Sequence, residues 1–409
     1  MNNPAMRFKR DDGTVFPDWS SSEIGNVADT CSGGTPSTSV SEYWDGPIQW
    51  LTPTEINSKY VHNSKRTITS AGIASSSAKL LPIGALLLTT RATIGACSIN
   101  NFDGDVSTNQ GFQSLICKSS LFNEYAYYAI TRDKFQKELI KHSSGSTFLE
   151  ISSKNLKKLP IPIPCLEEQQ KIASFFSTLD QKIELNERKL EVLKNFKKGV
   201  MQKIFSRKIR FKKDDGTDFP DWTVSELGNI AEIRGGGTPS TSNSDYWDGN
   251  IQWLTPTEID SKYVHESNRK ITESGLANSS AKLLPIGTIL LTTRATLGAC
   301  SINNFNGSVC TNQGFQSLVC KPIVLNEYVY YAITFDEFQK KITKHASGST
   351  FLEISAKNLK KLTIPTPSLE EQRKIADFLS TLDLQIDIKK KTVSAMLDLK
   401  RGFMQQMFV

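Results

Sequence analysis

The sequence predicts an α/β protein built from two copies of one unit, each a mixed α/β domain followed by a long helix. Three observations support this prediction. The chain repeats itself at a constant offset of 203 residues, the first part of each copy is rich in turn formers, and the second part has no proline and a heptad pattern of apolar residues. With 409 residues the chain is long enough for two or three domains of about 150 residues each.

The repeat is domain-sized and contains no insertion or deletion. Trp19 and Arg91 recur as Trp222 and Arg294, and 18 of the 20 positions from Tyr43 to His62 are identical to their counterparts in the second copy. A period of this length is too long for a solenoid. Two like domains in one chain favour a pseudo-twofold internal arrangement, as in a C2 homodimer.

The first part of each copy, 8–165 and 211–368, has the pattern of a mixed α/β domain. Turn formers such as Gly33-Gly34-Thr35-Pro36 alternate with short apolar runs such as Leu86-Leu87-Leu88, which is typical of buried strands between turns. One helix is predicted over Asn123–Lys141. The segment Leu159–Pro164 has proline at every second position, so it is predicted as an extended connector that no helix crosses.

The second part of each copy, 166–207 and 369–409, is predicted as a long helix. Apolar residues at alternating spacings of three and four form a heptad seam that is meant to pair with another helix. These residues are Ile172, Phe176, Leu179, Ile183, Leu190, Leu193, Val200 and Ile204, with Ile375, Leu379, Leu382, Ile386, Val393, Met396, Phe403 and Met407 in the second copy. A pseudo-twofold axis would make the two helices an antiparallel coiled coil that separates the two domains.

Each seam is interrupted by a polar residue near its midpoint, Asn186 in the first helix and Lys389 in the second. A polar residue in a coiled-coil seam commonly fixes register and orientation at a cost in stability. One hypothesis is therefore that the two side chains meet and set the register. The other is that both simply reach solvent at a loose crossing.

The composition is that of an ordinary globular protein, with 38% apolar residues and a formal charge of +7. The mild positive charge suits an anionic partner without identifying one. The seven cysteines include no C-x-x-C pair, so they are predicted to be small buried thiols. No run of 18 apolar residues occurs and Met1–Arg10 has no apolar signal region, so we expect a cytoplasmic protein with no membrane partner.

Catalytic motifs are missing from the sequence. It contains neither the glycine and Pro-Pro-aromatic motifs of a base-flipping methyltransferase nor the phosphate loop of an ATPase. A metal-dependent nuclease needs clustered acids beside a lysine; Pro17-Asp18 and Asp260-Ser261-Lys262 have this form, but Asn57 replaces the acid in the first copy. The four histidines offer no i,i+4 metal pair. We predict a non-catalytic chain without a metal site; the alternative is a self-sufficient nuclease or methyltransferase with an unrecognised site.

The spacer helices carry a family resemblance. The proline connector followed by Leu166–Ala173, then Leu179-Asp180 and a Lys-Lys-Gly ending at Gly199, resembles the conserved spacer of specificity subunits of type I restriction-modification systems, and Leu369–Ala376 is a second instance. Upstream, the segments Thr90–Gly95 and Ser144–Thr147 resemble motifs of that family's target recognition domains. The resemblance covers nearly the whole chain.

The resemblance implies a DNA-binding specificity subunit and not an enzyme. It implies two target recognition domains that each read one half of a bipartite sequence in double-stranded DNA, and two methyltransferase subunits that dock on the chain. Complexes of this family can add a motor nuclease subunit. In the family S-adenosylmethionine belongs to the methyltransferase subunit, so no cofactor is expected in this chain.

The two copies are more alike than is usual for the two recognition domains of this family. Two nearly identical recognition domains that contact antiparallel DNA strands predict an inverted-repeat target with a centre that is not contacted. Operator palindromes reflect the twofold symmetry of their proteins in the same way. The alternative is a target with two unrelated half-sites.

Candidate DNA-binding residues are Arg, Asn, Gln, Ser, Thr and Gly on turns, because Arg matches guanine and Asn or Gln matches adenine. They are Thr90, Arg91, Thr93, Asn109, Gln110, Ser144, Gly145 and Ser146, with Thr293, Arg294, Thr296, Asn312, Gln313, Ser347, Gly348 and Ser349 in the second copy. The alternative is that these residues only cap or turn the chain. The loop at Gly33-Gly34 and Trp50 could also face DNA, but core packing is the favoured interpretation of both.

Basic residues are concentrated between Glu167 and Lys213, where 13 Lys and Arg stand against 6 Asp and Glu. The ordinary interpretation is a solvated helix face. The alternative is a surface close to the phosphate backbone or to a groove of a partner subunit.

Overall fold

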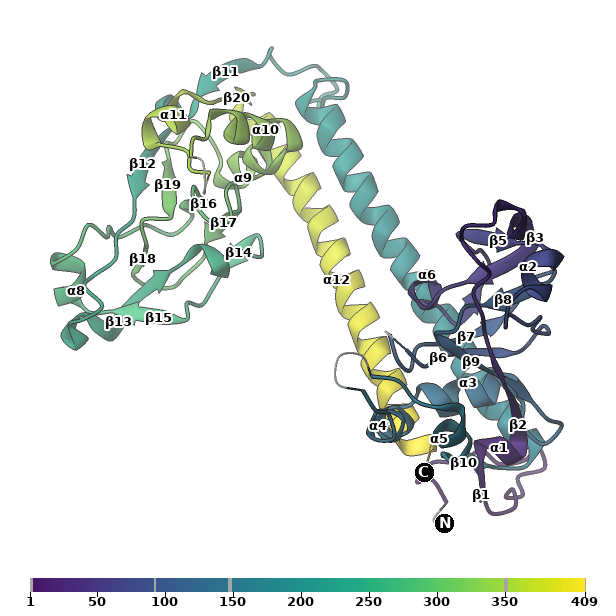
Figure 1. Ribbon diagram of the computed structural model, residues 1–409. Helices are drawn as coiled ribbons and strands as arrows, with labels where there is room; N and C mark the ends of the chain where they lie inside the picture. The colour runs from purple at the N-terminus through teal and green to yellow at the C-terminus, as the bar shows by residue number, and fades with distance from the viewer. Residues whose placement is uncertain (1–2, 92, 146–148, 349–351, 409) are drawn as a thin grey trace. The chain divides into compact units, whose positions relative to one another are not determined.

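The computed structural model describes residues 3–91, 93–145, 149–348 and 352–408 (Figure 1). The chain forms two compact units, and each is described by itself. Unit 1 comprises Met1–Arg188 and Lys391–Val409, and unit 2 comprises Lys189–Lys390. The predicted domain boundaries, 8–165 and 211–368, remain a prediction.

Unit 1 is built around a five-stranded sheet with the order β2-β9-β6-β7-β4 (Figure 1). Its strands are β2 (Ala28–Ser32), β9 (Phe112–Cys117), β6 (Leu86–Thr89), β7 (Cys97–Asn100) and β4 (Tyr60–Val61). All neighbours are antiparallel except β4 and β7, which are parallel. The sheet has a buried centre, because Leu86, Leu87 and Leu88 are all fully buried.

Two smaller sheets complete the strands of unit 1. The first has the order β5-β3-β8, from β5 (Arg66–Ile68), β3 (Trp44–Leu51) and β8 (Val106–Thr108). The second pairs β1 (Ser20–Glu23) with β10 (Pro160–Ile163) in antiparallel register. The proline connector is thus extended, as predicted, and is also a strand.

The short helices of unit 1 lie in loops between the strands. They are α1 (Ile24–Val27), η1 (Ser41–Tyr43), η2 (Pro53–Glu55), α2 (Ser70–Ala74), α3 (Asn123–Thr131), α4 (Asp133–Lys141) and α5 (Ser153–Lys157). Hydroxyl caps begin two of them: Thr69 accepts from the Gly72 N–H at the start of α2, and Ser152 accepts from the Asn155 N–H at the start of α5.

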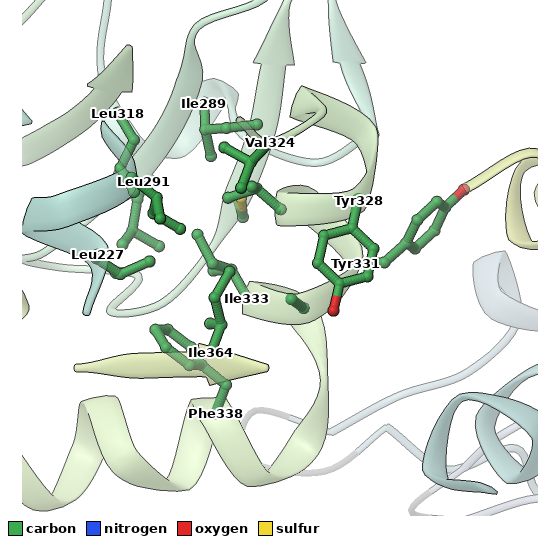
Figure 2. Packing of buried hydrophobic residues seen from close by; sticks show 14 of the residues in the cluster. Leu227, Ile289, Leu291, Leu318, Val324, Tyr328, Tyr331, Ile333, Phe338 and Ile364 are labelled. Atoms are coloured by element: carbon green, nitrogen blue, oxygen red, sulfur yellow. The ribbon is translucent and has the colours of Figure 1, made fainter. Parts of the chain in front are cut away.

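Unit 2 repeats the elements and sheet orders of unit 1. Its elements are β11 (Thr223–Glu226), α7 (Leu227–Ile230), β12 (Ala231–Gly235), η3 (Ser244–Tyr246), β13 (Trp247–Leu254), η4 (Pro256–Glu258), β14 (Tyr263–Val264), β15 (Arg269–Ile271), α8 (Glu273–Ala277), β16 (Ile289–Thr292), β17 (Cys300–Asn303), β18 (Val309–Thr311), β19 (Phe315–Cys320), α9 (Asn326–Thr334), α10 (Asp336–His345), α11 (Ala356–Lys361) and β20 (Thr363–Thr366). Figure 2 shows part of its core, in which Leu291 of β16 and Leu318 of β19 lie near Ile333 of α9.

The two long helices are α6 (Leu166–Phe205) and α12 (Leu369–Met407), close to the predicted bounds. Each contributes to both units, and their contacts within unit 1 run in opposite directions. Phe175 packs on Phe403 with ring centroids 5.1 Å apart, whereas Asn186, further along α6, lies 3.6 Å from the sulfur of Met396, which is earlier in α12. The predicted antiparallel pairing is confirmed within this unit.

The single helix predicted over Asn123–Lys141 is wrong in one respect, because the structure has two helices there. Arg132 lies between α3 and α4 with extended backbone angles, φ −68° and ψ 148°. The side chain of Gln136 donates to the Ile130 carbonyl at 2.8 Å and satisfies the end of α3. The break redirects the chain so that Phe135 and Leu139 of α4 are buried in the core.

Candidate nucleic-acid interface

The three predicted polar segments of unit 1 meet at the end of strand β6. The Thr90 N–H donates to the Gly111 carbonyl at 2.8 Å, next to the Asn109-Gln110 turn, and the Thr90 carbonyl accepts from the Ile151 N–H at 3.2 Å. Thr90 is buried, so it joins the loops instead of presenting its own hydroxyl. We call the group Thr90, Arg91, Thr93, Asn109, Gln110, Ser144, Gly145 and Glu150, with its equivalents in unit 2, the loop cluster.

Glu150 connects the arginine to the Ser-Gly segment. Its N–H donates to the Ser144 carbonyl and its carbonyl accepts from the Ser144 N–H, both at 2.9 Å. Its carboxylate lies 3.5 Å from Nε of Arg91. In unit 2, Arg294 donates to Oε2 of Glu353 from Nε at 3.1 Å and from Nη2 at 2.7 Å. Sequence analysis missed both glutamates, since no motif marks an acid that pairs with an arginine 59 residues away.

The loop that carries Arg294 has a strained backbone. Ala295 adopts a φ of 65°, a left-handed conformation that costs an alanine roughly 1 kcal/mol. Strain of this kind persists only where the surrounding contacts impose it, and it gathers at ligand-binding loops. Thr296, two residues on, is placed by a 3.3 Å bond from its hydroxyl to the Pro256 carbonyl.

The Asn-Gln turn divides into a structural residue and an exposed one. The side-chain oxygen of Asn109 accepts from the Gly111 N–H at 2.8 Å, so this side chain forms the turn. Gln110 is exposed, and its Oε1 accepts from the Thr35 hydroxyl at 2.5 Å. Unit 2 repeats this contact between Thr238 and Gln313 at 2.5 Å.

The remaining candidates differ in how far the structure describes them. Thr93, Ser144 and Gly145 are exposed, and so are Thr296, Ser347 and Gly348 in unit 2. Ser146 and Ser349 lie outside the described residues.

The Gly33-Gly34 segment and Trp50 are buried in the core, which agrees with the interpretation that the sequence favours. A Cβ on Gly33 would lie 2.1 Å from the Asn109 carbonyl oxygen, so glycine is required there by packing. Trp50 is buried, and its Nε1 donates to the Gly34 carbonyl at 2.9 Å.

An exposed arginine on the small sheet was not predicted. Cζ of Arg66 lies 3.5 Å from the centroid of the Trp44 ring, and Arg269 lies 3.6 Å from that of Trp247. A guanidinium stacked on an indole is held in one orientation. The two partners are 22 residues apart on neighbouring strands, a spacing that no sequence pattern marks.

The Glu-Glu-Gln segment at the start of α6 holds the helix on the domain. Glu168 is fully buried and accepts from Arg7 at 3.0 Å (Nε) and 2.8 Å (Nη2) and from the Trp19 indole at 2.9 Å. We call this the Arg–Glu–Trp cluster; Arg210, Glu371 and Trp222 repeat it in unit 2. The hydrogen bonds that Arg7 donates to Glu168 raise the pKa of Arg7, so the guanidinium stays charged.

Two further residues of the spacer motif make the same kind of contact. The Gln169 side chain accepts from the Phe122 N–H at 2.8 Å and donates to two carbonyls at 2.9 Å. Asp180 accepts from the Tyr128 hydroxyl at 2.7 Å and pairs with Lys400 of α12 at 2.6 Å. Burial, followed by the Asp180 carboxylate, raises the pKa of Tyr128 far above its ordinary value. The spacer motif on which the family resemblance rests therefore has a structural role, because its side chains bind the helix to the domain.

The basic stretch has internal partners at several positions. Lys197 pairs with Asp383, Lys198 lies 3.0 Å from Asp336, and Arg210 belongs to the Arg–Glu–Trp cluster. These contacts reduce the charge available to a phosphate backbone.

The described ranges lack both a metal-binding cluster and a membrane-spanning helix. No group of three or more His, Cys, Asp or Glu side chains there could hold a metal ion. Over the same ranges, no helix has the length and apolar character needed to cross a membrane. All seven cysteines are free thiols, and burial raises the pKa of Cys117 and Cys320 to about 12.

The chain thus consists of two repeated α/β units that each present a cluster of Arg, Gln and Ser side chains. The family model described as "Type I restriction modification DNA specificity domain" matches residues 17–195 and 220–397. The chain belongs to this family.

Known relatives agree with this assignment. The chain is 32% identical over 288 residues to the type I restriction enzyme MjaIX specificity subunit of Methanocaldococcus jannaschii, a match that covers 68% of the chain and 66% of the relative. The chain thus spans just under two thirds of that relative's length.

Two solved structures share the fold. One is a type I restriction-modification S subunit from M. genitalium, with a TM-score of 0.60 and 16% identity over 100% of this chain and 99% of the other. The second comes from a study of complex assembly and conformational transition of the type I system, with a TM-score of 0.62 and 19% identity over 96% and 98%.

Proposed function

We propose that the chain is the sequence-reading subunit of a cytoplasmic type I restriction-modification complex, in which each unit contacts one half of a bipartite double-stranded DNA target. The observation that carries the proposal is the loop cluster, in which equivalent backbone hydrogen bonds and an Arg–Glu ion pair occur in both units. Arg, Gln and Ser on turns are the side chains that read base edges in the major groove. Their placement beside one another gives each unit one contact surface.

The target is proposed to be an inverted repeat. The exposed members of the loop cluster, Arg91, Thr93, Gln110 and Ser144, are matched by the same residue types at Arg294, Thr296, Gln313 and Ser347. Identical side chains on equivalent loops of the two units should prefer the same bases. Two such readers related by a dyad bind half-sites in inverted orientation.

The helices are the proposed docking surface for two methyltransferase subunits, which would hold S-adenosylmethionine; a motor nuclease subunit can complete the complex. Val192 and Phe196 of α6 are 67% and 51% exposed and lie one turn apart on one face. Exposed apolar side chains at that spacing favour a helical partner.

Incubation with DNA, Mg²⁺ and S-adenosylmethionine tests the function. The purified chain alone should neither cleave nor methylate the DNA. Addition of the methyltransferase subunit should produce methylation confined to one sequence. Cleavage or methylation by the chain alone would support the alternative, a self-sufficient enzyme.

The docking surface has a matched test. Val192→Asp should abolish co-elution of the methyltransferase subunit with the chain. Val224→Asp is the control, because Val224 of β11 is 68% exposed and lies on a strand instead of the helix. Equal losses from both variants would place the docking surface elsewhere.

A further inference from the structure

Glu150 occupies the junction of the loop cluster. Its backbone pairs with Ser144, the following residue Ile151 donates to Thr90, and its side chain faces Arg91. In unit 2 the Glu353 backbone pairs with Ser347, the following residue Ile354 donates to the Thr293 carbonyl, and the Glu353 side chain pairs with Arg294. One glutamate per unit therefore joins two predicted DNA-contacting segments.

The ion pair of this glutamate is too exposed to serve stability. The side chains of Arg91 and Glu150 are 51% and 47% exposed, and those of Arg294 and Glu353 are 47% and 40% exposed. Exposed pairs of this kind contribute little to the free energy of unfolding. A carboxylate near DNA phosphates is also repelled by them, so its presence on a DNA-contacting surface calls for another role.

The geometry in unit 2 indicates that role. A single carboxylate oxygen of Glu353 accepts hydrogen bonds from Nε and Nη2 of Arg294, which form one edge of the guanidinium. A guanidinium is planar, so fixing one edge fixes the direction of the other. The Nη1–Nη2 edge is the one left for a base, and two parallel N–H donors match O6 and N7 of guanine.

We propose that Glu150 and Glu353 are positioning residues for DNA recognition, which orient Arg91 and Arg294 so that each reads one guanine in its half-site. This inference rests on the proposed function. The glutamates act through the arginines and do not contact a base themselves.

The test is a double-mutant cycle on the full chain with its methyltransferase subunit. Selection from a pool of randomised DNA duplexes first defines the wild-type target. Binding is then measured to that target and to duplexes in which one base pair of both half-sites is changed. The variants are E150Q/E353Q, R91A/R294A and the combination of all four substitutions.

E150Q/E353Q should lower the ratio of affinities for the target and the altered duplex about tenfold at a guanine position. This is roughly the contribution of one bidentate base contact. The arginine-to-alanine pair should lower this ratio at the same position, and the combination should add nothing further. Affinity for DNA without the target should not fall in the glutamine pair, because the substitution removes carboxylates that the phosphates repel. Glu184→Gln, which removes an exposed carboxylate paired with Arg188 on α6, should leave discrimination intact.

Each other outcome has a distinct meaning. Full discrimination by the glutamine pair contradicts the proposal while leaving the proposed function intact. A glutamine effect that persists without the arginines also contradicts it, because the glutamate would then read a base itself. A wild-type complex that selects no sequence overturns the proposed function and this inference with it.

Discussion

Two of the Arg–Glu pairs in each unit differ sharply in their surroundings. Arg7 and Glu168 form a two-point contact in which the carboxylate is fully buried and also accepts from Trp19. Arg91 and Glu150 face solvent beside turns. A charge pair that is desolvated must stay complete, whereas an exposed pair leaves one edge of its guanidinium open to a ligand. The first pair therefore holds the fold and the second is suited to binding.

The largest expected effect is on the buried pair. Glu168→Ala removes the carboxylate that accepts from Nε of Arg7 and from the Trp19 indole, and leaves these two N–H groups unsatisfied. The free energy of unfolding of unit 1 should fall by about 3 kcal/mol, measured by denaturant unfolding of the full chain. Glu167→Ala is the control, since the neighbouring Glu167 carboxylate is half exposed. If both variants unfold alike, Glu168 does not hold the helix on the domain.

The exposed pair should show the opposite behaviour. Arg91→Ala with Arg294→Ala should weaken binding of the assembled complex to its target by about 2 kcal/mol per half-site, as for a lost bidentate base contact. Its unfolding free energy should change by less than about 0.5 kcal/mol. Gel-shift titration and denaturant unfolding of the same preparation separate the two effects. If the arginine variant lost unfolding free energy and kept its affinity for the target, the exposed pair would hold the fold and would not bind DNA.

A smaller effect is expected where the domain touches α6 through Tyr128. Tyr128→Phe removes the bond to Asp180 and should cost about 1 kcal/mol at pH 7. Because folding raises the pKa of Tyr128 above its ordinary value of 10.0, its neutral form favours the fold. That contribution is complete below pH 10 and declines as the pH rises further. Unfolding curves at pH 7 and pH 11 should therefore differ less in the variant than in the wild type.

The smallest effect is a gain. Asn186 is half-buried in the helix seam beside the sulfur of Met396. Asn186→Leu should raise the free energy of unfolding by about 0.5 to 1 kcal/mol and weaken the preference for one helix orientation. A thermal melt of the variant checks the sign, and a lower melting temperature would argue against a register role for Asn186.

The sequence was sufficient for features that depend on pattern. The constant offset predicted two equal units, and the heptad spacing predicted α6 and α12. It was insufficient for features that depend on contacts between distant residues. The break at Arg132 arises from burial of Phe135 and Leu139, and the part played by Glu150 arises from a bridge to Ser144 and Arg91.

The most direct test of the account is the symmetry of the methylated target. Methylome sequencing of cells that carry the chain and its methyltransferase subunit reports both half-sites at once. Because the exposed side chains of the loop cluster are the same in the two units, we predict two half-sites that are inverted copies of each other around a centre that is not read. Two unrelated half-sites would contradict the claim that the loop cluster determines the sequence.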